Sequence, residues 1–167
     1  MKTRTSAIFG SAVFFLAAPC VVAGLLPWLI LDRYRLPLSI SLPYVVIGCI
    51  LIAVAVLVLL HSFARFALEG VGTPAPVAPT EKLVVGGIYR HVRNPMYVAV
   101  LSIIAGQALL FASWAVVLYG VVMGIAMASF VHFYEEPTLV RRYGDEYETY
   151  RRAVPGWLPR LTPWHGA

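Results

Sequence analysis

Long apolar runs separated by short polar segments dominate the chain. The first run covers residues 5–31 and the second residues 36–64, with a short polar turn at 32–35 between them. A third stretch, residues 95–134, contains no Asp, Glu, Lys or Arg. About 20 helical residues, each rising 1.5 Å, cross the hydrocarbon core of a bilayer. The first two runs are therefore each long enough for one membrane span, and the third is long enough for two.

The third stretch is predicted to fold back on itself as a helical hairpin. Its turn is expected at residues 111–114, because Trp114 would then lie at the membrane interface, where aromatic side chains gather. The two helices would cover residues 96–110 and 114–133. Small residues would let these helices approach closely: Gly106, Gly120, Gly124, Ala126 and Ala128.

The first run has a competing interpretation as a secretory signal, since residues 16–20 loosely resemble a lipoprotein cleavage site. Pro19 stands directly before Cys20, which argues against cleavage there. The apolar run also continues well beyond the roughly 7–15 residues of a signal sequence. The expectation is a retained membrane helix.

Polar segments follow the second and fourth predicted spans. Residues 70–79 contain three prolines among small and apolar residues, which favours a semi-rigid strap over a helix. After the hairpin, Glu135-Glu136-Pro137 is expected to open a polar helix, with the acidic side chains near the positive end of its dipole. Tyrosines and arginines at three- and four-residue spacing indicate an amphipathic helix at the membrane interface. It would be ended by Pro155, Pro159 and Pro163.

The composition agrees with a membrane protein, because 60% of the residues are hydrophobic and 13% are charged. Soluble domains average about 45–50% and about 25%. The net charge is +5, and eleven of the thirteen Lys and Arg residues fall on one side of a four-span topology, with Arg33 and Arg35 on the other. This excess places the basic side in the cytoplasm. The basic residues flank apolar runs, so the expected partners are membrane lipids and not nucleic acid. Cys20 and Cys49 lie within apolar runs and provide no framework for disulfides or zinc.

The sequence thus predicts an all-α integral membrane protein of about four transmembrane helices, with a cytoplasmic interfacial helix near the C-terminus. A single membrane domain would cover residues 1–167. Residues 1–69 would hold two N-terminal spans. Residues 70–167 would hold a polar loop, the helical hairpin and the amphipathic tail.

The polar loop, residues 83–97, combines glycines, aromatic residues and cations directly before a predicted span. Pro95 suits the first helical position of that span, and Asn94 suits its cap. The free amides of the helix would face the cytoplasm and could bind a carboxylate. An alternative is that the loop is only an interfacial anchor, since Tyr, Arg and His prefer headgroup depth in any membrane protein.

Two consecutive glutamates, of which Glu135 is the first, end the same hairpin and would therefore lie at the same cytoplasmic end as the polar loop. A carboxylate pair at a membrane boundary costs free energy unless a cation or a hydrogen-bond donor meets it. S-adenosylmethionine carries a carboxylate, an ammonium and a sulfonium, and the rings of Tyr89 and Tyr97 could contact the sulfonium. The alternative is that Glu135 pairs with Arg90 or Arg93.

The motif Gly-Ile-Tyr-Arg-His-Val-Arg-Asn-Pro-Met-Tyr at 87–97 is followed by Glu-Glu-Pro at 135–137 and Tyr-Gly-Asp-Glu-Tyr at 143–147. This pattern resembles the isoprenylcysteine carboxyl methyltransferase family, which groups with the phospholipid methyltransferases. The resemblance covers about residues 72–159. It implies a membrane-embedded, S-adenosylmethionine-dependent methyltransferase with its cofactor site facing the cytoplasm. The implied acceptor is lipophilic: the carboxylate or amine of a lipid-like or prenylated small molecule.

The resemblance also implies which residues bind the cofactor: Leu83, Val84, Tyr89, Asn94, Pro95, Met96, Tyr97 and Glu135. Two positions depart from the family. Asn94 stands where the family usually has His, although Asn can also donate and accept hydrogen bonds. Val131 stands where the eukaryotic prenylcysteine enzymes have an Arg near the substrate, which argues against a prenylcysteine carboxylate as the acceptor.

No catalytic base and no metal site are predicted. A sulfonium methyl is already activated, so an enzyme chiefly has to align the acceptor and exclude water. His132 and the two glutamates have metal-like helical spacing, but a second ligand-bearing helix is missing. His61 and Gln107 are expected to be hydrogen-bond partners between helices, and His91 a headgroup or backbone contact. The rival functions are a sterol-type membrane reductase that binds NADPH and a non-catalytic membrane scaffold. Neither the acceptor nor the oligomeric state follows from the sequence.

Overall fold

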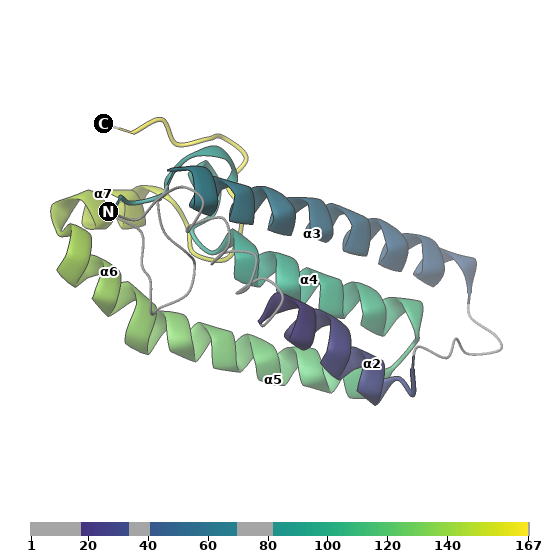
Figure 1. Cartoon of the computed structure of the whole chain (residues 1–167). Coiled ribbons are helices and arrows are strands. Elements are labelled where there is room, and N and C mark those ends of the chain that lie inside the picture. Colours follow the sequence, from purple (N-terminus) through teal and green to yellow (C-terminus); the bar gives the residue numbers. More distant parts are fainter. Residues whose placement is uncertain (1–17, 34–40, 70–81, 167) are drawn as a thin grey trace.

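The computed structural model describes residues 18–33, 41–69 and 82–166 (Figure 1). Within these ranges every regular element is a helix, as the apolar runs predicted. The elements are the π-turn η1 (Val21–Leu25), α2 (Leu26–Ile30), α3 (Leu42–Glu69), the 3-10 turn η2 (Gly87–Arg90), α4 (Pro95–Leu110), α5 (Trp114–Phe130), the π-turn η3 (Val131–Glu135), α6 (Glu136–Tyr143) and α7 (Asp145–Ala153). The start of the first expected span and the strap at 70–79 lie outside the described residues.

Two helices are long and apolar enough to cross a membrane. They are Leu42–Phe66 and Trp114–Tyr143, the second of which joins α5, η3 and α6. Many of their large apolar side chains are exposed, for example Leu57 at 67%, which suits a lipid environment. The other apolar helices, Val21–Ile30 and Pro95–Leu110, are shorter.

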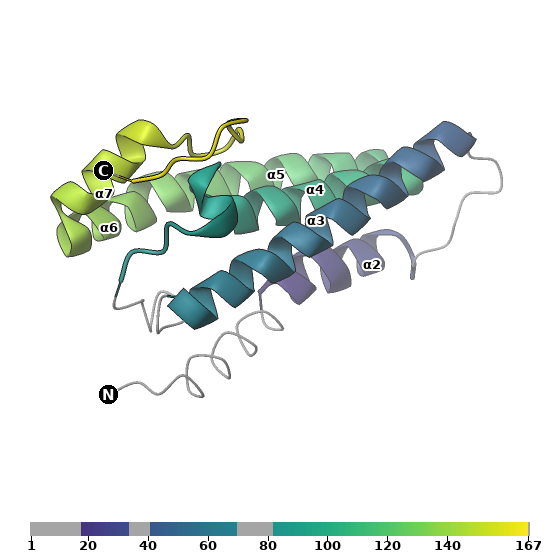
Figure 2. The ribbon, with the colours of Figure 1, turned by 90° about the horizontal axis from the view of Figure 1, so that it is seen from above.

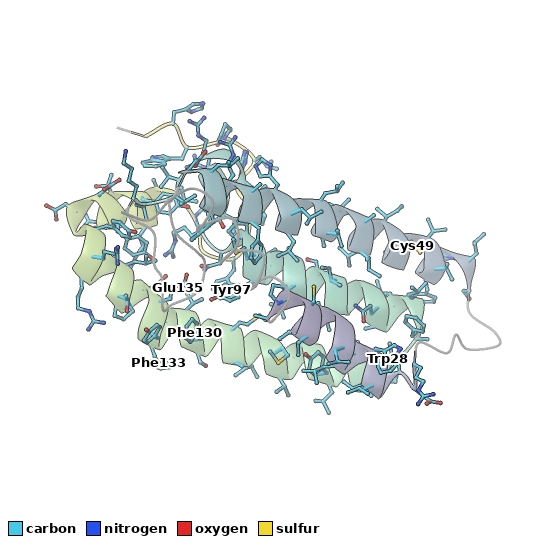
Figure 3. All side chains as sticks on the ribbon, in the orientation of Figure 1. Trp28, Cys49, Tyr97, Phe130, Phe133 and Glu135 are labelled. Carbon is cyan, nitrogen blue, oxygen red and sulfur yellow. The ribbon has the colours of Figure 1, made fainter. Side chains whose placement is uncertain are left out.

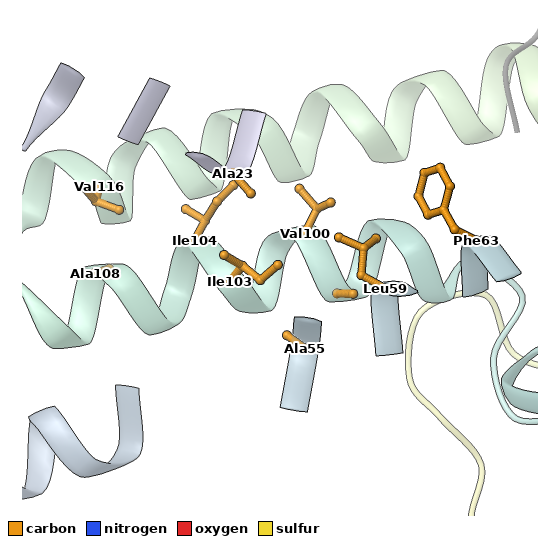
Figure 4. Close-up of a cluster of buried hydrophobic side chains, with 10 residues drawn as sticks. Ala23, Ala55, Leu59, Phe63, Val100, Ile103, Ile104, Ala108 and Val116 are labelled. Carbon is orange, nitrogen blue, oxygen red and sulfur yellow. The ribbon is translucent and has the colours of Figure 1, made fainter. Parts of the chain in front are cut away.

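α4 is the central helix, with α3 packed along one side and α5 along another (Figures 1 and 2). A Cβ atom on Gly48 of α3 would lie 2.8 Å from the carbonyl oxygen of Gly106 on α4. The two backbones therefore meet without side chains between them, as in other closely packed membrane helices. Figure 4 shows the buried cluster around α4, which includes Ala23, Ala55, Leu59, Phe63, Val100, Ile103, Ile104, Ala108 and Val116.

The α4–α5 hairpin has its turn at the predicted place. α4 ends at Leu110 and α5 begins at Trp114, whose side chain is 83% exposed. The N–H of Val116 donates to Oγ of Ser113 at 3.4 Å, so this serine caps α5. The length of the charge-free stretch and the position of its tryptophan were sufficient to locate this turn.

The first described segment is held by hydrogen bonds from the hairpin. Pro27 lacks the N–H that would reach the Ala23 carbonyl in an α-helix or the Val22 carbonyl in a π-helix. Nε2 of Gln107 donates to the Ala23 carbonyl at 2.6 Å, and the Tyr119 hydroxyl donates to the Val22 carbonyl at 2.7 Å. Side chains of α4 and α5 therefore satisfy two carbonyls in an apolar setting, as predicted for Gln107.

The expected polar helix, α6, begins at Glu136 with Pro137 in its first turn, but it continues directly from α5. α5 continues through η3 into α6 without interruption, and only Glu136 separates the π-turn η3 from Pro137, which cannot donate a backbone hydrogen bond. The polar helix was therefore predicted at the right place, but it has no free N-terminus there, because the π-turn accommodates the proline inside a continuous helix. The break comes later, at Gly144, whose φ is 53°.

The tyrosines of α7 face the protein. Tyr147 and Tyr150 are 2% and 3% exposed and belong to a second buried cluster with Val154. Partly buried side chains pack against this cluster: Leu83, Val85, Leu139, Val140, Tyr143, Ala153 and Trp164. The amphipathic pattern was recognised from the sequence, but its apolar side covers the polar loop.

Candidate functional site

A cavity of about 500 Å³ lies where α3 ends, α4 begins and α5 runs into α6. All eight residues predicted to bind a cofactor line it: Leu83, Val84, Tyr89, Asn94, Pro95, Met96, Tyr97 and Glu135. Phe63 and Phe66 of α3 and Tyr147 and Tyr150 of α7 also line the cavity, and these four were not predicted. Four segments that are distant in sequence therefore contribute to the wall of one cavity.

The 3-10 turn η2 places Tyr89 by packing against the end of α3. Gly87 has a φ of 58°, and a Cβ atom there would lie 2.5 Å from Nε2 of His61, so glycine permits this approach. Tyr89 is 4% exposed, and its ring centroid lies 5.6 Å from that of Phe66. The hydroxyl of Tyr150 donates to the backbone carbonyl of Tyr89 at 2.7 Å. The turn is therefore fixed by both α3 and α7.

Tyr97 and Glu135 join the two helices of the hairpin at the cavity. The Tyr97 hydroxyl donates to Oε2 of Glu135 at 2.9 Å, and Figure 3 shows the two side chains pointing toward one another. The ring of Trp157 lies 6.3 Å from that of Tyr97. Glu135 makes no ion pair with any residue in the described ranges. Its negative charge is therefore available to a cationic ligand.

The next residue, Glu136, forms an ion pair with Arg93 of the polar loop. Nη1 of Arg93 donates to Oε1 of Glu136 at 2.6 Å and to the Tyr147 hydroxyl at 2.9 Å. Nε of Arg93 donates to the Val154 carbonyl at 3.0 Å. The alternative in which Glu135 pairs with a loop arginine is therefore not the arrangement found.

The C-terminal tail holds the polar loop from outside. Four backbone hydrogen bonds join the two segments, from Arg93 N to Pro155 O at 2.9 Å, Asn94 N to Gly156 O at 3.2 Å, Arg160 N to His91 O at 2.9 Å and Trp164 N to Arg90 O at 3.0 Å. Nδ1 of His91 also lies 2.8 Å from the Arg160 carbonyl oxygen, which is the backbone contact expected for this histidine. The sequence offered no signal for this pairing, because it is made by main-chain groups.

Burial raises the pKa of the tyrosines that surround the cavity outside the helical spans. The pKa of Tyr89 is raised well above its ordinary value by burial and by the nearby Tyr150 and Glu135. Burial also raises the pKa of Tyr147 and Tyr150, although the positive charge of Arg93 opposes the rise at both. These phenols are therefore neutral hydrogen-bonding groups at physiological pH.

Two buried polar atoms on the cavity wall lack a hydrogen-bond partner among the described residues: Nδ2 of Asn94 and the hydroxyl of Tyr89. Asn94 is 8% exposed and precedes α4, but its side chain forms no capping hydrogen bond, contrary to the prediction. Ser62 lies close enough to Tyr89 to oppose the rise in the pKa of that phenol, and its own hydroxyl donates to the Val58 carbonyl at 2.7 Å. A buried polar group without a partner costs about 1–3 kcal/mol, which both atoms would recover by contacting a ligand.

The beginning of α4 adds main-chain donors to the same wall. The first intrahelical hydrogen bond runs from Val98 N–H to the Asn94 carbonyl at 3.1 Å. The amides of Met96 and Tyr97 precede it and have no acceptor within the helix. Unpaired amides at a helix N-terminus favour an anion, so this wall suits a carboxylate.

The histidines provide no metal site in the part of the chain that the structure describes. No group of three or more His, Cys, Asp or Glu side chains there has the geometry to hold a metal ion. The ring of His132 instead meets that of Phe133 edge-on at 4.8 Å. His61 lies beside the Gly87 turn at the end of α3.

Comparison with known proteins relates this chain to methyltransferases. A family model described as phospholipid methyltransferase matches residues 43–146, more than half of the chain. The Protein-S-isoprenylcysteine O-methyltransferase of Schizosaccharomyces pombe is 35% identical over 80 residues, which cover 47% of this chain and 34% of that protein. The chain thus aligns with about a third of the length of this curated relative. No solved structure matches the chain significantly.

Proposed function

The chain belongs to the phospholipid methyltransferase family, and from this premise we propose that it is a membrane methyltransferase that uses S-adenosylmethionine. The proposed acceptor is a lipophilic molecule that enters from the bilayer. The proposed cofactor site is the cavity between η2, α4 and η3, with the eight predicted residues on its wall. The observation that carries the proposal is the pair of unpartnered buried atoms, Asn94 Nδ2 and Tyr89 OH, in that cavity.

The chemistry of the wall fits the cofactor. The free amides of α4 and Nδ2 of Asn94 would receive its carboxylate, and the uncompensated carboxylate of Glu135 would receive its ammonium group. The rings of Tyr89 and Tyr97 suit a sulfonium, since aromatic faces attract cations. A cavity of about 500 Å³ also falls within the roughly 300–1,000 Å³ that is usual for small-molecule sites.

In this proposal the bound cofactor supplies an activated methyl group, and the protein supplies position and a dry environment. The Tyr97–Glu135 hydrogen bond fixes the side of the cavity that meets the amino-acid part of the cofactor. Phe63 and Phe66 exclude water from another side. Alignment of the two reactants supplies the acceleration, and no side chain is assigned as a base.

The apolar part of the cavity wall supports a lipophilic acceptor. Val22, Val100, Ala126, Met127 and Phe130 line the side that continues into the spans. Phe130 on α5 is 39% exposed. Other large apolar side chains of α5 are also exposed, as expected of a helix that contacts lipid. An acceptor with an apolar body would therefore pass from the bilayer along α5 to the cofactor, which enters from the polar end.

The proposed topology has four spans within a single membrane domain, residues 1–69 and 70–167 contributing two spans each. The short Val21–Ile30 and Pro95–Leu110 helices would cross together with the two longer ones. The cavity would then face the cytoplasm, because eleven of the thirteen Lys and Arg residues lie on its side of the membrane.

Calorimetric titration of the purified protein with S-adenosylhomocysteine tests the proposal. We expect saturable binding and a rise in melting temperature, and no response to NADPH. Asn94→Ala should weaken binding, because it removes a donor that the free protein leaves unpaired. The matched control is Ser102→Ala on α4, whose hydroxyl bonds only to the Val98 carbonyl of its own helix. Absence of binding at millimolar S-adenosylhomocysteine, or a response to NADPH alone, would contradict the methyltransferase function.

A further inference from the structure

Three charged side chains line the described cavity: Arg93, Glu135 and Arg142. Arg93 is engaged by Glu136, Tyr147 and the Val154 carbonyl. Glu135 accepts a hydrogen bond from Tyr97. The guanidinium of Arg142 makes no ion pair with a described residue, and its Cζ lies 5.7 Å from the centroid of the Tyr143 ring.

We infer that Arg142 contacts an acidic head group of the methyl acceptor, a phosphate or a carboxylate. This inference rests on the proposed methyltransferase function. Arg142 lies on α6, seven residues after Glu135, which is about 10 Å further along the helix. It therefore stands about two helical turns from the carboxylate assigned to the cofactor's ammonium group, on the same helical wall of the cavity as Met127 and Phe130.

The position and the charge together define the acceptor as an acidic amphiphile. Its apolar body would lie along α5, its reacting atom beside the cofactor, and its anionic group against Arg142. A guanidinium forms paired, charge-assisted hydrogen bonds with phosphate and carboxylate, and Tyr143 leaves its edge free to do so. Arg142 is exposed, so binding needs no desolvation of a buried cation.

Decyl phosphate, with decanol as the uncharged comparison, serves as the probe in lipid nanodiscs saturated with S-adenosylhomocysteine. We expect decyl phosphate to bind and Arg142→Gln to weaken it by about tenfold, as for other charge-assisted hydrogen bonds. Arg142→Lys, which keeps the charge, should retain part of the affinity. The matched control is Arg141→Gln, because Arg141 is also exposed on α6 but bonds to Thr138 and does not line the cavity. Equal affinities in wild type and Arg142→Gln, or an equal loss in Arg141→Gln, would overturn the assignment.

A second arm separates the acceptor from the cofactor as the source of the anion. S-adenosylhomocysteine has a carboxylate, whereas 5′-methylthioadenosine has none. If Arg142→Gln weakens the first ligand and spares the second, Arg142 binds the cofactor carboxylate and the acceptor assignment is wrong. Decyl phosphate is also titrated without S-adenosylhomocysteine. If the proposed function is wrong, the wild-type protein will not bind S-adenosylhomocysteine. If only this inference is wrong, Arg142→Gln will bind decyl phosphate as tightly as the wild type does.

Discussion

Glu135 and Glu136 are neighbours in the chain, but they contact different partners. Glu135 lines the cavity and is bonded by the neutral phenol of Tyr97, whereas Glu136 neutralises Arg93. Because the two glutamates are consecutive residues of one helix, their side chains point in different directions. In the proposed site the carboxylate of Glu135 would bind the cofactor, whereas Glu136 holds Arg93 in place.

Replacement of each glutamate by glutamine should separate these two roles. Glu135→Gln keeps the size of the side chain and most of its hydrogen bonding but removes the charge, so the affinity for S-adenosylhomocysteine should fall about tenfold to a hundredfold. Its melting temperature should change little. Glu136→Gln should instead lower stability by about 1–3 kcal/mol, because it leaves the largely buried Arg93 without its counter-charge.

Calorimetry and thermal unfolding of the two variants in the same detergent would check this division. Unchanged affinity in Glu135→Gln together with a lowered melting temperature would assign that residue to structure. Glu136→Gln serves as the matched control, since it removes the same carboxylate one residue further along the chain.

The residues of the candidate site were predictable where they carried unusual chemistry. Tyr89, Asn94 and Glu135 stand out in a chain that is otherwise apolar, and all three line the cavity. Phe63 and Phe66 were not predictable, because an aromatic residue in a span reads the same whether it faces lipid or a cavity. The ion pair of Arg93 with Glu136 was not predicted, because the sequence analysis considered a loop arginine only as a partner of Glu135.

At the scale of elements, the hairpin was predictable and the distortions of the helices were not. A charge-free stretch of twice the span length has to turn, and its tryptophan marked the place. The π-turns η1 and η3 each precede a proline, Pro27 and Pro137. The sequence shows the prolines, but whether a helix breaks or widens depends on partners that are distant in the chain.

A double-mutant cycle tests the account of η1. Gln107→Leu should destabilise the protein, because it leaves the Ala23 carbonyl without a donor in an apolar setting. Pro27→Ala restores a backbone N–H that could reach the same carbonyl, so Gln107→Leu should cost less in that background. The expected coupling is about 0.5–2 kcal/mol, measured by unfolding in detergent.

Tyr119→Phe tests the second carbonyl in the same way, because the Tyr119 hydroxyl donates to the Val22 carbonyl. Equal costs of Gln107→Leu in the wild-type protein and in the Pro27→Ala variant would show that the side-chain amide does not replace the missing backbone donor.

At the scale of the whole molecule, the polar chemistry gathers at one end of a set of apolar helices. Figure 1 shows the end of α3, the start of α4, α6 and α7 together at this end, with the α4–α5 turn at the other. The tail and the polar loop are joined by main-chain hydrogen bonds there, and α3 adds Phe63 and Phe66 to the cavity wall. Composition alone indicated the lipid environment, whereas this closure required the folded chain.

Cysteine accessibility tests which end of the molecule faces the cytoplasm. Cys20 and Cys49 are free and exposed, so both are first replaced by alanine. Trp114→Cys then marks the hairpin turn and Glu146→Cys marks α7, both of which are exposed. In intact cells an impermeant maleimide should label the turn but not α7, because the excess of Lys and Arg retains the α7 side in the cytoplasm. Opening the cells should then expose the second position.

The three labelling outcomes bear on different parts of the topology. Labelling of both positions from the same side would mean that α5 and its continuation do not cross the bilayer, which contradicts four spans. Labelling of Glu146→Cys alone from outside would keep the crossing but invert the orientation, and the cavity would then face away from the cytoplasm. S-adenosylmethionine is a charged, membrane-impermeant compound, so an inverted cavity would also contradict the proposed function. Labelling of the turn alone fits a site that draws its cofactor from the cytoplasm and its acceptor from the lipid.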